Sequence, residues 1–231
     1  MLIVMEGLDG AGKSTQVKKL KDYLSEACPP LEYIHFPRYD APVYGGLIGK
    51  FLRGGFGDNK TVHPQLVALL FAEDRHGAVP EMRRILDSGG TLLLDRYVYS
   101  NIAYQCAKMP DEARAEQLKE WILATEYGEF GLPRPDLNIF LDVPIGFVEK
   151  SLSADRTSDD HREYLEGGKD IHEADIEFQK RVRGWYQAQA RSDSSFVVVD
   201  CSAGDGGMLP PETIFAMVKA LVQKSLGIKS R

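Results

Sequence analysis

Residues 2–15 read LIVMEGLDGAGKST, a short apolar run that passes into a glycine-rich segment and then into a lysine and two hydroxyl residues. The apolar run at residues 2–5 is typical of a strand buried on both faces. From Lys13 to Leu24 the apolar side chains recur at helical spacing, with charged residues between them. The sequence therefore predicts a strand, a glycine-rich loop and a helix in direct succession.

The glycine-rich loop fits the pattern GxxxxGK[ST] in the context that this pattern requires. Its glycines let the backbone curl with N–H groups around phosphate oxygens, and the helix N-terminus adds positive potential there. Lys13 is expected to reach the β- and γ-phosphates of a nucleotide, and the Ser14 hydroxyl is expected to bind Mg²⁺. The predicted phosphate-binding residues are Gly7, Gly10, Ala11, Gly12, Lys13, Ser14 and Thr15.

The rest of the chain alternates between short apolar runs and longer helix-compatible segments, which indicates a parallel sheet. Further strands are predicted at residues 31–36, 91–95, 137–143 and 196–201. Further helices are predicted near residues 43–53, 64–88, 98–108, 111–127, 144–154, 172–192 and 211–226. We therefore expect a three-layer α/β fold with a central, mostly five-stranded parallel sheet. Without repeats or linkers, residues 1–231 are expected to be one domain, with a polar lid segment near 152–170.

Composition limits the possible functions. The 231 residues are 43% hydrophobic and carry a net charge of -6, which argues against a protein that coats nucleic acid. An apolar run of about 18 residues, long enough to span a membrane, is missing, and a cytoplasmic protein is expected. The spacing of Cys28, Cys106 and Cys201 favours reduced thiols. The histidines lack metal-ligand spacing and are expected at the surface or at helix ends: His35, His63, His76, His161 and His172.

A second site is predicted where the strand at residues 91–95 ends in Asp95, Arg96 and Tyr97. Asp95 fits a carboxylate that orients Mg²⁺, partly through water, and Arg96 fits a clamp on the phosphate under attack. A structural interpretation remains open, in which Asp95 caps the following helix and Arg96 only pairs with it.

Four motifs in order carry a family resemblance: the phosphate-binding loop, FPRY at residues 36–39, LFAEDR at residues 70–75, and DRY at residues 95–97 followed by Ser100 and Asn101. With these motifs the chain resembles the thymidylate kinase family over nearly its whole length. The resemblance implies phosphorylation of dTMP to dTDP with ATP and Mg²⁺. It also implies a homodimer formed through helices beside the acceptor site.

The resemblance further implies roles for individual residues. Asp9, a further catalytic candidate, is expected to contact the 3'-hydroxyl side of the nucleotide and to help hold the acceptor phosphate, which Arg38 and Arg96 bind. Phe71 is expected to stack on thymine, and Arg75 is expected to hydrogen-bond its carbonyl edge. Residues four apart share a helix face, which supports this last pairing. Phe71 and Tyr104 also fit as ordinary core residues. The other expected dTMP-binding residues are Phe36, Tyr39, Ser100, Asn101 and Tyr104.

The lid is expected to supply an arginine to the transferred phosphate. Some thymidylate kinases carry an arginine directly after the aspartate of the phosphate-binding loop, where this chain has Gly10. Arg156 and Arg162 resemble lid arginines that other branches use instead, and Arg156 is the first candidate for catalysis beside Lys13 and Arg96. A solvated, charge-rich surface loop is the alternative.

Two other functions fit parts of the sequence. A deoxynucleoside kinase shares the fold and the lid but needs a carboxylate base for a neutral hydroxyl acceptor, and Arg38 follows Phe-Pro at the corresponding strand end. An ATP-dependent switch protein would use the phosphate-binding loop with negligible turnover. The residues of the second site would then have no purpose.

We predict that Arg156→Ala causes a large loss of kcat with little change in dTMP affinity, because a lid arginine acts on charge that develops during transfer. Steady-state kinetics with a separate dTMP binding titration measures both. Near-normal turnover would remove Arg156 from the mechanism and make Arg162 the next candidate.

Overall fold

The computed structural model describes residues 1–154, 163–165, 170–173 and 175–227. Within these residues one sheet contains five parallel strands in the order β2-β3-β1-β4-β5. This arrangement confirms the predicted parallel α/β fold. The strands are β1 (Leu2–Gly7), β2 (Leu31–His35), β3 (Thr91–Asp95), β4 (Leu137–Asp142) and β5 (Phe196–Asp200).

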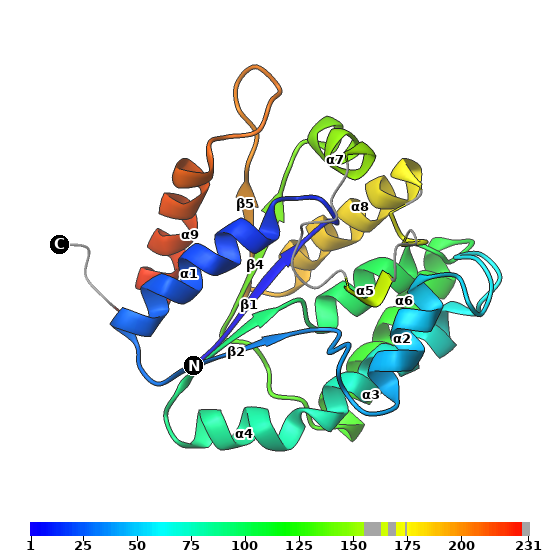
Figure 1. The fold of residues 1–231 in the computed structure, drawn as a ribbon, viewed down its shortest axis with the longest axis horizontal. Helices are drawn as coiled ribbons and strands as arrows, with labels where there is room; N and C mark the ends of the chain where they lie inside the picture. Colours follow the sequence, from blue (N-terminus) through cyan, green and yellow to red (C-terminus); the bar gives the residue numbers. More distant parts are fainter. Residues whose placement is uncertain (155–162, 166–169, 174, 228–231) are drawn as a thin grey trace.

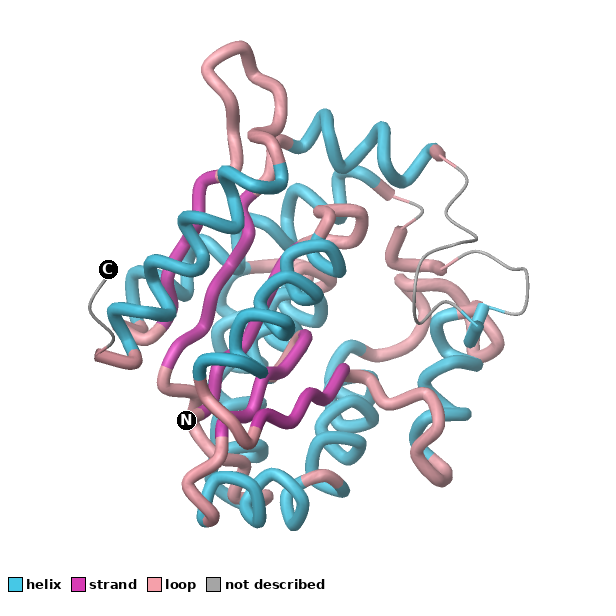
Figure 2. Tube along the Cα trace, turned by 60° about the vertical axis from the view of Figure 1, so that its left-hand side comes forward, coloured by secondary structure: helices cyan, strands magenta, loops and turns pink. Residues whose placement is uncertain are grey.

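Helices cover both faces of the sheet, as Figure 1 and Figure 2 show. α1 and α9 pack together on one face, while α5 and α8 pack together on the other, and α2, α3 and α6 extend beyond α5. The α-helices are α1 (Lys13–Ala27), α2 (Tyr44–Leu52), α3 (Pro64–Gly77), α4 (Val79–Asp87), α5 (Val98–Cys106), α6 (Glu112–Leu123), α7 (Ile145–Ser153), α8 (Ile176–Ser192) and α9 (Pro211–Ser225). Short turns of other helix types are η1 (Ala124–Glu129) and η2 (Glu163–Leu165).

The prediction of a single helix at residues 64–88 is wrong, because two helices, α3 and α4, occupy this range. α3 ends at Gly77, and Ala78 separates it from α4. Pro80 explains the break, since proline has no amide hydrogen and its ring displaces the carbonyl of the preceding turn.

Two other helix boundaries also differ from the prediction. The α-helix predicted at residues 111–127 stops at Leu123 and continues as the π-helical turn η1. α8 begins at Ile176, four residues later than expected from the range 172–192. Asp175 caps it, because its carboxylate accepts hydrogen bonds from the first free amides of the helix.

The central strands β1 and β4 are buried at every position, as expected for the middle of a parallel sheet with helices on both faces. Their carboxyl ends lead into the segments that carry the predicted site. The phosphate-binding loop follows β1, and Arg96 follows the neighbouring strand β3. Sheet order therefore places these two segments side by side.

A buried carboxylate ties β1 to the helices on one face. Glu6 accepts hydrogen bonds from the backbone N–H groups of Tyr97 (3.0 Å) and Ser100 (3.3 Å). It also accepts from the hydroxyls of Ser100 (2.5 Å) and Tyr186 (3.0 Å). Burial raises the pKa of Glu6, although these donors oppose the shift. One side chain thus connects β1, the start of α5 and the middle of α8.

We predict that Glu6→Ala lowers the free energy of unfolding by at least about 3 kcal/mol, because it leaves several buried donors without an acceptor. Urea denaturation followed by circular dichroism measures this change. Glu212→Ala is the matched control, since Glu212 lies on the surface and pairs with Lys19 in solvent. Equal effects of the two substitutions would contradict a structural role for the Glu6 network.

Candidate active site

The phosphate-binding loop has the backbone that its glycines permit. Gly10 and Gly12 adopt left-handed conformations with φ of +73° and +71°. Gly12 directly precedes α1, and no side chain caps this helix. The first amide groups of α1 are therefore left to bind an anion. Ser14 and Thr15 are exposed in the first turn, beside these amides.

Lys13 and Asp95 form an ion pair at the base of the loop, and both side chains are almost fully buried. Burial lowers the pKa of Lys13, although Asp95 opposes the shift. Burial also disfavours ionisation of Asp95, but Lys13, His35 and Arg96 together outweigh it, so the pKa of Asp95 is lowered. The structure thus brings together the lysine predicted for phosphates and the carboxylate predicted for Mg²⁺.

Arg96 connects the loop to the second site. Its Nη2 donates to Asp9 at 2.6 Å, and its Nη1 donates to Ser100 at 3.3 Å. Arg96 adopts a φ of +66°, a strained conformation for a residue with a Cβ. This conformation, held by the surrounding contacts, turns the guanidinium toward the loop.

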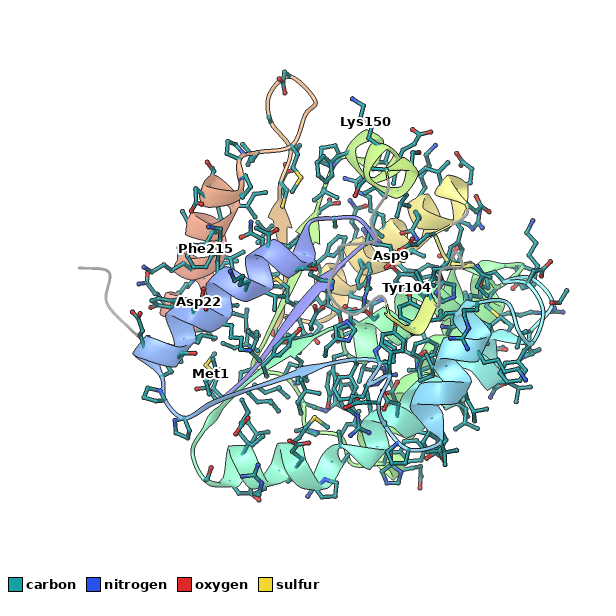
Figure 3. All side chains as sticks on the ribbon, in the orientation of Figure 1. Met1, Asp9, Asp22, Tyr104, Lys150 and Phe215 are labelled. Atoms are coloured by element: carbon teal, nitrogen blue, oxygen red, sulfur yellow. The ribbon has the colours of Figure 1, made fainter. Side chains whose placement is uncertain are left out.

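Asp9 receives donors from three other elements of the fold. Besides Arg96, the Tyr104 hydroxyl donates at 2.8 Å and Gln179 Nε2 donates at 3.2 Å. Figure 3 shows Asp9, in the loop, close to Tyr104 on α5. Gln179 was not predicted from the sequence, because a lone glutamine on α8 carries no motif that points to Asp9.

Two pockets meet at Asp9 and Arg96. The first follows the phosphate-binding loop from Leu8 to Thr15 and includes Asp95. The second lies between α3 and α5 and includes Phe71, Arg75 and other predicted dTMP-binding residues. The residues that line both pockets are Asp9, Pro37, Tyr39, Arg96 and Tyr164.

The far end of the second pocket contains a buried ion pair. Arg75 donates from Nε to Glu126 at 2.5 Å and from Nη2 at 2.8 Å. Asn101 Nδ2 also donates to Glu126, at 2.9 Å, while Asn101 Oδ1 has no hydrogen-bond partner among the described residues. Phe71 lies half-buried beside them and contacts the edge of Phe51. Glu126 was missed because it lies on a π-helical turn that the sequence does not signal.

Of the candidate residues in FPRY, Phe36 and Tyr39 line the second pocket and Arg38 does not. Phe36 is buried and lines the second pocket, and the Tyr39 ring stacks on Tyr164 with a centroid separation of 4.0 Å. Arg38 lines neither of the two joined pockets; its Nε donates to Asp74 at 3.0 Å, in a neighbouring cleft. Its predicted role in binding the acceptor phosphate stays a prediction.

The expectation that all histidines lie at the surface or at helix ends is wrong for His172, which is 5% exposed and lines the second pocket. Aromatic rings surround it, and the segment before α8 carries it inward. Arg156, Arg162 and His161 lie outside the described residues. In the part of the chain that the structure describes, no helix is long and apolar enough to cross a membrane.

A parallel sheet with this loop, joined to a second pocket through an arginine, defines a small-molecule kinase of the phosphate-loop class. The family model for thymidylate kinase matches residues 5–204. The chain is 34% identical over 186 residues to thymidylate kinase of Mycobacterium tuberculosis, covering 80% of this chain and 84% of that one. It is 32% identical over 202 residues to the human enzyme, covering 87% and 82%.

A solved structure of thymidylate kinase from Candida albicans superposes with a TM-score of 0.71 and 28% sequence identity. The match covers 99% of this chain and 93% of that one. The chain therefore belongs to the thymidylate kinase family.

We predict that Arg75→Leu lowers the free energy of unfolding by about 3–5 kcal/mol, because it leaves the buried Glu126 carboxylate without its cation. Adding Glu126→Leu should recover much of this loss. Arg114→Leu is the matched control, since Arg114 pairs with Asp111 in solvent. Denaturant titration of the variants measures the effect. If the double variant is no more stable than Arg75→Leu, the unpaired Glu126 carboxylate is not the source of the loss.

Proposed function

We propose that the chain transfers the γ-phosphoryl group of ATP to dTMP, which gives dTDP. The observation that carries this proposal is the junction of the two pockets at Asp9 and Arg96. A phosphate bound on the loop and a phosphate at the end of the second pocket would meet beside one guanidinium. Phosphoryl transfer needs this alignment more than it needs covalent chemistry from the protein.

The second pocket offers groups that complement a thymine base. Thymine presents one N–H donor between two carbonyl acceptors. Asn101 Oδ1 is a buried acceptor that lacks a partner among the described residues, and Arg75 supplies donors beside it. Phe71 provides a half-buried ring for stacking. A cytosine ring has an acceptor at the position of that N–H and would face the Asn101 oxygen unfavourably.

The acceptor needs no general base. A phosphate monoester has a second pKa of about 6, so its oxygen is already an anionic nucleophile at neutral pH. The difficulty is to bring two polyanions together, and Lys13 and Arg96 supply positive charge at their meeting point. We propose that Arg156, with Arg162 as the alternative, adds charge from the lid.

The loop also fits Mg²⁺. Ser14 exposes its hydroxyl in the first turn of α1, and the Asp95 carboxylate lines the same pocket. The described residues contain no cluster of three or more metal-ligating His, Cys, Asp or Glu side chains. Few protein ligands suit Mg²⁺, which keeps water and binds substrate phosphates. When bound, Mg²⁺ would neutralise phosphate charge, and Ser14 and Asp95 would hold it.

We further propose that residues 1–231 act as one domain and that the protein is cytoplasmic. A homodimer through helices beside the acceptor pocket is proposed from the family resemblance.

We predict that coupled detection of ADP from ATP and Mg²⁺ shows dTMP as the preferred acceptor over dUMP, dCMP, dGMP, AMP and thymidine. Lys13→Ala should lower kcat by at least about 100-fold with dTMP, because it removes a charge aimed at the transferred phosphate. Preference for thymidine would indicate a deoxynucleoside kinase instead. ATP binding without acceptor-dependent turnover would support a switch protein.

A further inference from the structure

Two tyrosine rings form a wall that the two joined pockets share with a third hollow. Tyr39 and Tyr164 stack with ring centroids 4.0 Å apart and ring planes inclined by 9°. Together with Pro37 they line the first pocket, the second pocket and an outer cleft. Exposed residues such as Asp40 and Gly46 also line this outer cleft, so it reaches the surface. The stacked rings therefore lie between the outer cleft and the region where the two pockets meet.

Tyr164 is held at both ends of its side chain. Its hydroxyl donates to Asp170 Oδ2 at 2.6 Å, and Asp170 Oδ1 accepts from the backbone N–H of His172 at 2.7 Å. At the other end, the backbone carbonyl of Tyr164 accepts a hydrogen bond from Nη1 of Arg53. The orientation of the ring is thus fixed by residues outside the short turn η2 that carries it.

Asp170 is an unfavourable side chain for a pocket that takes an anion. It is buried and lines the second pocket, and burial, with Asp9 adding to it, raises its pKa. A buried carboxyl beside another carboxylate costs free energy. Its hydrogen bond with Tyr164 forms in either protonation state, because a protonated carboxyl can donate to the hydroxyl oxygen. The presence of Asp170 is therefore most simply explained by its hold on Tyr164.

Helix α2 supports both tyrosines with one face. Gly45 approaches Tyr39 so closely that a Cβ there would lie 2.4 Å from the Tyr39 carbonyl oxygen. One turn later, a Cβ on Gly49 would lie 3.6 Å from Cβ of Tyr164. Residues four apart share a helix face, so α2 packs against both halves of the stack. The wall is braced from the side of the outer cleft.

Water at the junction of the pockets would compete with the acceptor. In transfer, the bond between the γ-phosphorus and the ADP oxygen breaks, and a bond to a phosphate oxygen of dTMP forms. In hydrolysis the same bond breaks, but the new bond is to water, which yields inorganic phosphate and a proton. Excluding water prevents this side reaction.

We propose that the stacked rings of Tyr39 and Tyr164 keep water of the outer cleft away from the transferred phosphoryl group, and that Asp170 is the positioning residue for Tyr164. This inference rests on the proposed function. It gives the wall a role in directing the phosphoryl group to the acceptor, beyond lining the pocket.

The test measures ADP by a coupled assay and dTDP by chromatography, with ATP, Mg²⁺ and saturating dTMP. Excess hydrolysis is the rate of ADP formation minus the rate of dTDP formation. We expect Tyr164→Ala to raise excess hydrolysis about 10-fold, because water of the outer cleft then reaches the phosphates. Lower turnover of a folded Tyr164→Ala variant without added excess hydrolysis would show that Tyr164 only lines the pocket, and would overturn the proposal.

Further variants test whether Asp170 acts through Tyr164, and they also serve if Tyr164→Ala does not fold. Tyr164→Phe and Asp170→Ala remove the same hydrogen bond. Each should raise excess hydrolysis about 3-fold, and the double variant should raise it no further. Asp170→Asn keeps a hydrogen-bonding group for the Tyr164 hydroxyl and should stay near the wild-type value. Additive effects of Tyr164→Phe and Asp170→Ala would refute the positioning role.

The control and the wild-type protein distinguish the remaining outcomes. Tyr23→Ala on α1 removes a half-buried tyrosine that lines none of these three hollows, and should leave excess hydrolysis unchanged. If the wild-type protein forms no dTDP, the proposed function fails before any variant is compared. If it forms dTDP and the Tyr164 variants show no added excess hydrolysis, only the role of the wall is refuted.

Discussion

The Glu6 carboxylate joins the three elements on which the active site is built. It lies one residue before the end of β1 and binds donors at the start of α5 and on α8. Burying a carboxylate is costly unless several donors surround it, and these donors are fixed by the fold. The positions of the phosphate-binding loop, the wall of the acceptor pocket and α8 are therefore coupled through one side chain.

Arg96 depends on the same arrangement. Its left-handed backbone is unfavourable for a residue with a Cβ, and it persists because Asp9 and the Glu6 network hold the guanidinium. Ser100 links Arg96 to the Glu6 network, since its hydroxyl contacts both side chains. The cation between the pockets is consequently oriented before any substrate binds, which favours transfer because no reorganisation is needed during the reaction.

The sequence predicted the features that depend on local patterns. Buried strands have continuous apolar runs, and the loop from Gly7 to Thr15 has a fixed spacing, so both were found without tertiary information. The family resemblance added Phe71 and Arg75, which line the second pocket. Glu126 and Gln179 were missed, because their contacts join residues far apart in the chain and depend on how helices pack. Local pattern likewise could not show that His172 points inward.

The acceptor pocket contains a polar atom that the folded protein does not satisfy by itself. Asn101 lines the pocket, and its Oδ1 is buried without a partner among the described residues, which costs on the order of 1–3 kcal/mol. An apolar replacement would avoid this cost in the free protein, so the amide oxygen at this place is most simply explained by binding. A nucleotide base with a donor at this position recovers the cost, and one without it is rejected by the same amount.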